Sequence, residues 1–229
     1  MPSPDRPLVG IVDYGMGNLF SVQRACERVG LEARLASSRR ELERAEGVIL
    51  PGVGAFGDAM QALRRLELVE PLRTAAASGK PFMGICLGLQ LLMRESHEFG
   101  RHEGLGIVEG DVVRLSEGAQ EGRRLKVPQV GWNRIAPAQG RRWADSWLRG
   151  LPDGACLYFV HSFYVRPADP SLALSQTRYG PTEFCSSLQR GNLFACQFHP
   201  ERSGSLGLAI YRNFAAAVMS PALSEVTRS

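Results

Sequence analysis

Short apolar runs alternate with amphipathic segments along the first half of the chain. Each run has three to six residues, the length of a strand that is covered on both faces. The runs span residues 8–12, 31–36, 48–50 and 82–85. This alternation predicts a parallel sheet with helices on both of its faces.

The segments between these runs are predicted to be helices. The first has apolar residues at i, i+3, i+4 and i+7 counted from Val22, with Asn18 as a suitable N-cap and Gly30 at its end. Further helices are expected from Asp58 through Leu66, over 75–78 and over 89–94.

Strands predominate in the second half, which ends in a helix. Strands are predicted at 107–115, 127–135, 157–165, 183–188 and 193–198, and the helix from about 206 to 219. Residues 189–192 between the last two strands form a suitable hairpin turn. We therefore expect one α/β domain over residues 1–229. It should have a central, mostly parallel sheet flanked by helices, with additional mixed or antiparallel strands in the second half. Its core should cover about 7–219, and 220–229 should be a flexible tail.

Composition and charge exclude several classes of protein. Of 229 residues, 44% are hydrophobic and 22% are charged, as is typical of globular domains. The apolar runs are far shorter than the roughly 18–20 residues of a membrane span, and the first residues lack a signal-peptide pattern. Five cysteines without a CxxC pair argue against a disulfide framework or zinc site, so we expect a cytoplasmic protein without metal or cofactor. The net charge is only +4 and the charged residues are scattered along the chain, which argues against a nucleic-acid partner.

The strongest signal for chemistry is Gly84-Ile85-Cys86-Leu87-Gly88. It lies between an apolar strand and a helical segment, where a G-x-nucleophile-x-G turn presents its central side chain above a sheet. Glycines are expected there because a Cβ would clash with the neighbouring strand. The helix start favours a thiolate and directs the N–H of Leu87 toward a developing oxyanion. A lone cysteine is more often a small buried hydrophobe, but the glycines and the strand–helix context favour a nucleophile.

A thiol nucleophile needs a base, and the chain has four histidines. His97 and His102 lie in a polar stretch and are expected to face solvent, whereas His161 lies within an apolar strand, as a core histidine would. His199 follows a strand and precedes a proline, which places it at the carboxyl edge of the sheet. Glu201 is suited to orient the imidazole as the third member of a triad.

Residues 52–57 match the G-x-G-x-x-G of dinucleotide-binding sites. Such a site needs an acidic residue about 20 residues further on, at the end of the next strand. Residues 75–79 read Ala-Ala-Ala-Ser-Gly instead, and Pro51 interrupts the entry from the strand. We interpret Gly52 and Gly54 as allowing the backbone to move beside the cysteine and to offer N–H groups to an anion.

The G-x-C-x-G-x-Q of residues 84–90 and the His-Pro-Glu of 199–201 resemble the motifs of class I (triad) glutamine amidotransferases. Further segments narrow the resemblance to one family within that class, the glutaminase subunits of imidazole glycerol phosphate synthases. They are DYGMGN at 13–18, PGVGAFG at 51–57, KVPQVGWN at 126–133, YFVHS at 158–162 and FHPERS at 198–203. The resemblance spans residues 8 to about 218 and implies a flavodoxin-like fold.

The resemblance also implies a reaction. Cys86 would attack the side-chain amide of glutamine, while His199 moves protons and Glu201 orients the imidazole. Backbone N–H groups would hold the oxyanion and so form an oxyanion hole. If a peptide flip makes and unmakes this hole, the isolated chain should have low activity. The implied substrate-binding residues are Gly52, Val53, Gly54, Leu87, Gln90, Glu98, Ser162 and Phe163.

A partner is implied because ammonia released into water becomes ammonium and loses its nucleophilicity. In the family the partner is a (β/α)8-barrel cyclase of histidine biosynthesis, which forms a heterodimer with the glutaminase. The residues implied to face it are Asn18, Lys126, Gln129, Trp132, Tyr158 and Arg202. Arg202 stands where many relatives carry lysine. The arginine-rich connections at 118–124 and 138–149 are longer than is usual for the family, and no role is assigned to them.

Two other functions remain open from the sequence. One is a triad amidotransferase subunit of another pathway, such as anthranilate or pyridoxal phosphate synthesis, against which residues 13–18 and 126–133 argue. The other is a cysteine hydrolase or a non-catalytic binding module on the same scaffold. A hydrolase of that kind usually has its acid before the histidine, and a binding module would have lost part of the triad.

Overall fold

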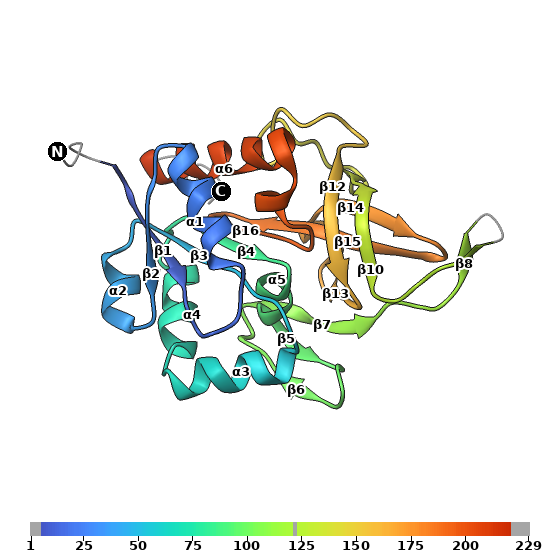
Figure 1. Ribbon diagram of the computed structural model, residues 1–229, viewed down its shortest axis with the longest axis horizontal. Coiled ribbons are helices and arrows are strands. Elements are labelled where there is room, and N and C mark those ends of the chain that lie inside the picture. Colours follow the sequence, from blue (N-terminus) through green and yellow to red (C-terminus); the bar gives the residue numbers. More distant parts are fainter. Residues whose placement is uncertain (1–5, 121–122, 221–229) are drawn as a thin grey trace.

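The computed structural model describes residues 6–120 and 123–220. Five strands lie parallel and adjacent in its main sheet, in the order β2-β1-β3-β4-β16 (Figure 1). They are β1 (Leu8–Val12), β2 (Glu32–Ala36), β3 (Gly47–Leu50), β4 (Phe82–Ile85) and β16 (Leu193–Cys196). The carboxyl ends of these neighbours therefore share one edge of the sheet, where sites of α/β proteins form.

Helices cover both faces of this parallel part (Figure 1). The helices are α1 (Leu19–Arg28) and α6 (Gly204–Met219) on one face, and α2 (Arg39–Arg44), α3 (Phe56–Arg65) and α4 (Val69–Ala77) on the other. Alternation along β1 divides the core accordingly: Val9 and Ile11 pack with α1 and α6, and Val12 packs with α3 and α4. The expectation of a parallel sheet covered on both faces is confirmed.

The rest of the main sheet is mostly antiparallel. It contains β5 (Met93–Ser96), β6 (His102–Glu103), β7 (Val108–Arg114), β11 (Ala136–Pro137), β13 (Phe163–Pro167), β14 (Ala173–Tyr179) and β15 (Thr182–Arg190). Two separate strand pairs join β10 (Gln129–Arg134) to β12 (Cys156–His161), and β8 (Ala119–Gln120) to β9 (Arg123–Arg124). The short α5 (Leu87–Leu91) follows β4, and the 3₁₀ turns are η1 (Pro170–Leu172) and η2 (Pro200–Arg202).

Two element predictions are wrong. The helix expected over 89–94 is α5, which begins at Leu87 and ends at Leu91, and the residues that follow form β5 beside β7. The strand expected over 157–165 is two strands: β12 pairs with β10, and β13 pairs with β7 and β15. A local apolar run cannot distinguish these cases, because long-range strand pairing decides them.

The segment 138–149 is not simply a polar connection. Its Trp143 and Trp147 are buried, and the Trp147 ring centroid lies 5.4 Å from that of Phe194 and 5.3 Å from that of Phe214. These rings extend the core cluster under α6, so this segment contributes to packing. Within the other arginine-rich connection, 121–122 lie outside the described residues, as does the predicted tail from 221 onward.

Other element boundaries differ by a few residues from those expected. Helix α3 begins at Phe56, α4 begins at Val69 ahead of Pro71, and α6 begins at Gly204. Asn18 is at the N-cap of α1 as expected, but its side chain makes no capping hydrogen bond. No helix in the described ranges is long and apolar enough to cross a membrane.

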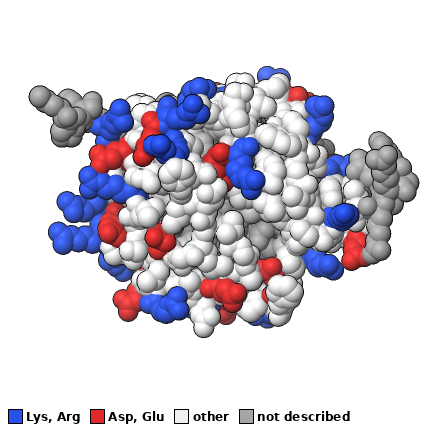
Figure 2. Space-filling view, in the orientation of Figure 1, with Lys and Arg blue, Asp and Glu red and all other residues white. Residues whose placement is uncertain are grey.

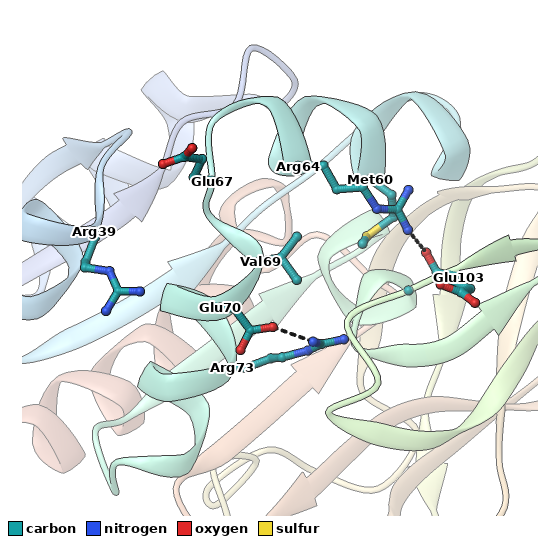
Figure 3. A pocket seen from close by; sticks show the side chains of 9 residues that line it. Arg39, Met60, Arg64, Glu67, Val69, Glu70, Arg73 and Glu103 are labelled. Atoms are coloured by element: carbon teal, nitrogen blue, oxygen red, sulfur yellow. Dashed lines mark hydrogen bonds and ion pairs between the residues drawn. The ribbon is translucent and has the colours of Figure 1, made fainter.

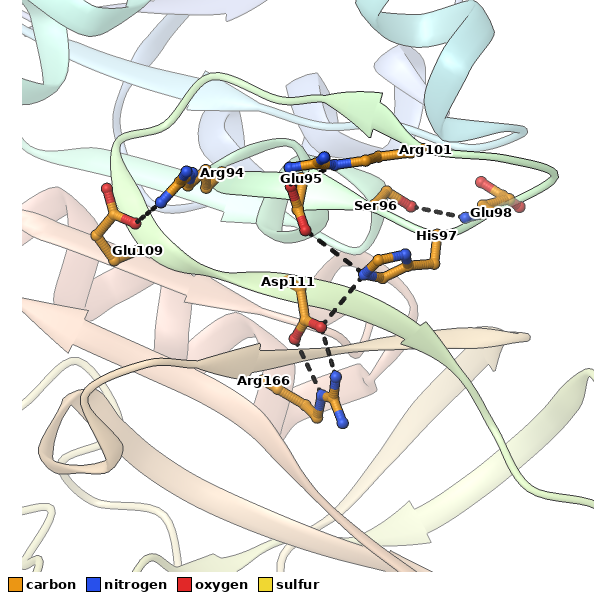
Figure 4. A network of polar contacts seen from close by, with 9 residues as sticks. All are labelled: Arg94, Glu95, Ser96, His97, Glu98, Arg101, Glu109, Asp111 and Arg166. Atoms are coloured by element: carbon orange, nitrogen blue, oxygen red, sulfur yellow. Dashed lines mark hydrogen bonds and ion pairs between the residues drawn. The ribbon is translucent and has the colours of Figure 1, made fainter.

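Charged side chains lie mostly toward the rim of the face seen in Figure 2, although a blue and a red side chain lie near its centre. The charged network in Figure 4 ties together β5, β7 and β13. Arg166 on β13 donates two hydrogen bonds to Asp111 on β7, at 3.0 and 2.5 Å. His97 Nε2 lies 3.5 Å from Asp111 and 3.6 Å from Glu95 on β5, which also accepts from Arg101. These strands position the segment that carries Glu98.

We expect Asp111→Asn to lower the free energy of unfolding by about 1 kcal/mol at neutral pH. The hydrogen bonds from Arg166 hold the pKa of Asp111 below its usual value. A depressed pKa stabilises the fold above the unfolded-state pKa of about 4, and this contribution is lost as the pH falls through the folded-state value. Urea unfolding at pH 7 and at pH 3.5 should therefore show the difference between variant and parent shrinking in acid. Asp145→Asn, at an exposed position, is the control and should show no such difference.

Candidate active site

Cys86 sits in a sharp turn between β4 and α5, with φ +55° and ψ −108°. A positive φ is unfavourable for a residue with a Cβ and has to be held by its surroundings. A Cβ on Gly88 would collide with the carbonyl oxygen of Leu50 on β3, and one on Gly84 would lie 3.0 Å from the Cβ of Ala195 on β16. The expectation that these glycines let the turn approach the neighbouring strands is confirmed.

The sulfur of Cys86 is nearly buried, at 5% exposure of the residue. Its thiol donates to the carbonyl oxygen of Val160 at 3.7 Å, and it accepts from the side-chain amide of Gln197 at 3.6 Å. Neither partner was singled out from the sequence. In the sequence, the only indication that Gln197 belongs to the site is its position two residues before His199.

His199 and Glu201 form a buried pair at the carboxyl end of β16. His199 Nδ1 lies 2.7 Å from Glu201 Oε1, and the two side chains are 5% and 1% exposed. The backbone is held as well, because His199 N–H donates to the carbonyl oxygen of Tyr158 and the Ser203 hydroxyl donates to that of His199. This pairing orients the imidazole so that Nε2 is its other polar atom. In the described part of the chain, that nitrogen has no hydrogen-bond partner.

Electrostatics couple His199 to Cys86. Burial alone would lower the pKa of His199, but Cys86 and the Glu201 carboxylate outweigh it and raise this pKa to about 10. The imidazole is therefore cationic at neutral pH, and a cationic imidazole favours a nearby thiolate. The structure thus brings together Cys86, His199 and Glu201, which lie far apart in the sequence.

A cavity of about 240 Å³ opens beside Cys86. Of the eight predicted substrate-binding residues, all but Gly52 line it: Val53, Gly54, Leu87, Gln90, Glu98, Ser162 and Phe163. Gly52 is not part of the lining, and a Cβ on it would collide with the hydroxyl of Tyr14. That hydroxyl donates to the carbonyl oxygen of Pro51 and thereby holds the loop after β3. Sequence reasoning missed three lining residues, Pro128, Val160 and His161.

The polar atoms of Gln90 and Glu98 are partly committed to the protein. The Gln90 amide nitrogen donates to the carbonyl oxygen of Phe163 at 2.9 Å and to Gln197 Oε1 at 3.0 Å, so its own oxygen is left to accept. Glu98 Oε2 accepts from the N–H of Phe56 at the start of α3, at 2.6 Å. Partial burial raises the pKa of Glu98. Both residues thus offer an acceptor oxygen near the cavity, which suits a cationic ligand group.

His161 is a core histidine, as expected, although it also lines the cavity. Its Nδ1 lies 2.9 Å from the carbonyl oxygen of Phe163, and its Nε2 lies 3.1 Å from the side chain of Gln129. Burial lowers the pKa of His161 to about 4, so it is neutral near pH 7. His97 is exposed as expected, whereas His102 is half-buried.

Five of the six residues expected at a partner interface lie at least partly on the surface. Asn18, Lys126, Trp132 and Arg202 are exposed, and Tyr158 is half-buried. The Arg202 guanidinium lies 4.1 Å from the centre of the Tyr158 ring, which meets Trp132 edge-on and lies 6.4 Å from the His199 ring. Gln129 is the exception, because it is 3% exposed and contacts His161. Its side chain therefore belongs to the interior.

A larger cleft, of about 450 Å³, lies between α2, α3 and α4 (Figure 3). Two of its arginines are engaged within the chain: Arg73 pairs with Glu70, and Arg64 donates to the carbonyl oxygen of Glu103. Its lining includes no cysteine or histidine. No group of three or more His, Cys, Asp or Glu in the described ranges is placed to hold a metal ion. The smaller cavity beside Cys86 is therefore the better candidate for chemistry.

Known proteins resemble this chain in sequence over most of its length. The family described as glutamine amidotransferase class-I matches residues 10–218. "Imidazole glycerol phosphate synthase subunit HisH" of Rhodopirellula baltica is 50% identical over 210 residues, which are 92% of this chain and 98% of that protein. "Imidazole glycerol phosphate synthase subunit HisH 1" of Legionella pneumophila (strain Lens) is 42% identical over 207 residues, which are 90% and 97% of the two chains.

Solved structures share the fold. A crystal structure of a glutamine amidotransferase has a TM-score of 0.69 and 21% identity, and covers 92% of this chain and 98% of that one. A putative GMP synthase protein of Thermoplasma acidophilum has a TM-score of 0.68 and 17% identity, and covers 95% and 96%. The predicted α/β architecture is thereby confirmed.

We expect Glu201→Gln to lower the pKa of His199. The carboxylate favours the charged imidazole, so a neutral amide at the same place removes part of that stabilisation. A loss of about one pKa unit or more would follow from removing a charge in direct contact. The measurement is an NMR titration of the labelled His199 ring, with His97 as the internal reference. An unchanged His199 pKa would contradict the proposed coupling.

Proposed function

This chain belongs to the class I glutamine amidotransferases, and from that premise we infer that it is the glutaminase subunit of an imidazole glycerol phosphate synthase. It hydrolyses glutamine to glutamate and ammonia, and the ammonia serves histidine biosynthesis. The relatives' names support the pathway. The observation that carries the chemistry is Cys86, held at a positive φ beside a buried His199–Glu201 pair at one cavity.

Cys86 is the proposed nucleophile, and His199 the proposed acid and base. The thiolate attacks the side-chain amide carbon of glutamine, and the resulting oxyanion collapses as His199 protonates the departing ammonia. A thioester joins Cys86 to the glutamyl group at this stage. His199, now neutral, takes a proton from water, which attacks the thioester and releases glutamate. Glu201 holds Nδ1 throughout, so Nε2 remains directed at the reaction.

Backbone N–H groups of Leu87 and of the Gly52-Val53-Gly54 segment are the proposed oxyanion donors. Leu87 begins α5 directly after the nucleophile, and Val53 and Gly54 line the same cavity. Gly54 has φ +96°, a conformation that glycine adopts at little cost. We propose that a peptide flip in this segment makes and unmakes the oxyanion hole, so that the isolated chain would be a slow glutaminase.

Four residues are proposed to recognise the amino-acid end of glutamine. The free side-chain oxygen of Gln90 and the carboxylate of Glu98 suit the α-ammonium group, because both accept hydrogen bonds and one is anionic. Ser162 and Phe163, which line the same cavity, are proposed to hold the α-carboxylate. The distance between these groups and Cys86 then selects glutamine by its length.

The proposed partner is a (β/α)8-barrel cyclase that receives ammonia out of contact with water. The surface around Trp132 fits such a partner, because large apolar side chains are exposed beside an aromatic–arginine cluster. Val130 and Trp132 on β10 are 60% and 58% exposed, and Val53 at the cavity mouth is 42% exposed. Asn18, Lys126, Tyr158 and Arg202 would contribute polar contacts.

The test is glutamate release from glutamine by the purified chain, with and without the barrel cyclase and its nucleotide ligand. We expect low basal turnover that rises strongly only with the liganded cyclase. Cys86→Ala should lose activity by a factor on the order of 10⁴ or more, because the nucleophile is gone. Cys156→Ala is the matched control and should retain the activity of the parent.

Two results would contradict parts of the proposal. Turnover that ignores the cyclase would retain a glutaminase but assign it to another acceptor, as in anthranilate or pyridoxal phosphate synthesis. A lack of turnover under all conditions, with Cys86 also unreactive to a glutamine-analogue alkylator, would overturn the enzymatic function.

A further inference from the structure

Gln197 is a buried polar residue that the triad mechanism does not use. It follows β16 directly, is 0% exposed, and its backbone N–H donates to the carbonyl oxygen of Ser186 at 2.9 Å. Its side-chain amide lies between Gln90 and the sulfur of Cys86. Burying an amide is costly unless its groups are hydrogen-bonded, so the partners of this side chain indicate what it does.

We propose that Gln197 stabilises the thiolate of Cys86 by donating an amide hydrogen bond to its sulfur, and that Gln90 sets the direction of that donor. The inference rests on the proposed role of Cys86 as a nucleophile. It adds a thiolate-stabilising residue to the triad, and it gives Gln90 a second task besides binding substrate.

The direction of the Gln197 amide follows from a chain of hydrogen bonds with a fixed end. The carbonyl oxygen of Phe163 can only accept, so the group of Gln90 that lies 2.9 Å from it must be the amide NH₂. That same nitrogen lies 3.0 Å from Gln197, which must therefore present its oxygen there. The NH₂ of Gln197 is left to face Cys86 Sγ at 3.6 Å. Reversing Gln197 would set two NH₂ groups against each other.

This donor acts on the sulfur and not on the imidazole. A hydrogen bond to an ionised acceptor is stronger than one to a neutral acceptor, so the Gln197 amide favours thiolate over thiol. Because Gln197 is neutral and its amide is oriented by Gln90, this hydrogen bond does not depend on the protonation state of His199.

The test is the pH dependence of Cys86 alkylation by iodoacetamide in the full chain, followed on the Cys86 peptide by mass spectrometry. Three variants are compared with the parent: Gln197→Leu, Gln197→Glu and Gln189→Glu. Gln197→Leu removes the donor, and we expect the alkylation midpoint to rise by about one pH unit, a roughly tenfold loss of rate below it. Gln197→Glu keeps an acceptor for Gln90 but places a carboxylate against the sulfur, so its midpoint should rise further.

Gln189→Glu is the matched control. It makes the same chemical change on β15 and keeps an oxygen for the N–H of Trp147, so it should leave the midpoint unchanged. If Gln197→Leu fails to fold, the isosteric Gln197→Glu still tests the donor. Parental midpoints in the folded Gln197 variants would overturn the proposal, as would an equal rise in Gln189→Glu. Alkylation needs no glutamine, so failure of the glutaminase proposal would appear only in the turnover assay.

Discussion

The absence of a side chain at position 88 is the constraint on which the site depends. The turn that carries Cys86 passes so close to β3 that a Cβ on Gly88 would collide with a backbone carbonyl. The approach to β16 is less close, and a Cβ on Gly84 would lie 3.0 Å from the Cβ of Ala195. This close approach holds Cys86 at a positive φ, which a residue with a side chain does not adopt freely. The strain is tolerated because β3, β4 and β16 are hydrogen-bonded neighbours in a fully buried part of the sheet.

The parallel order of the strands then assembles the remaining groups. The glycine segment follows β3, the nucleophile follows β4 and His199 follows β16, and these three strands are adjacent. Parallel neighbours place their carboxyl ends at one edge of the sheet. Cys86 and His199, which are more than a hundred positions apart in the sequence, are therefore close together in the fold. The antiparallel strands contribute Val160 and Phe163 to the lining of the cavity. The site therefore lies where the two kinds of sheet join.

The site contains more buried polar atoms without hydrogen-bond partners than a well-packed core would favour. His199 Nε2, Glu201 Oε2 and the hydroxyl of Tyr211 are buried without hydrogen-bond partners within the described ranges. Such groups are costly in a core, and their presence at the triad is consistent with stability given up for reactivity. The side-chain amides of Gln90 and Gln197, by contrast, are hydrogen-bonded, and a chain of hydrogen bonds sets their orientation. His199 Nε2 thus remains free to exchange protons, whereas the amides of Gln90 and Gln197 are fixed in orientation.

The parallel core, the nucleophile turn and the histidine–glutamate pair could be predicted from the sequence, because each depends on local spacing. The signals were short apolar runs, glycines on either side of one cysteine, and a proline that ends a strand between a histidine and a glutamate. The structure differs from these expectations at 89–94 and 157–165, and Gln129 is buried although it is expected at an exposed interface. The folded chain settled these points, and it alone revealed that Gln197 contacts the sulfur. The pairing of strands and the burial of single polar side chains depend on contacts between residues that are far apart in the sequence. Local sequence patterns therefore cannot predict either of them.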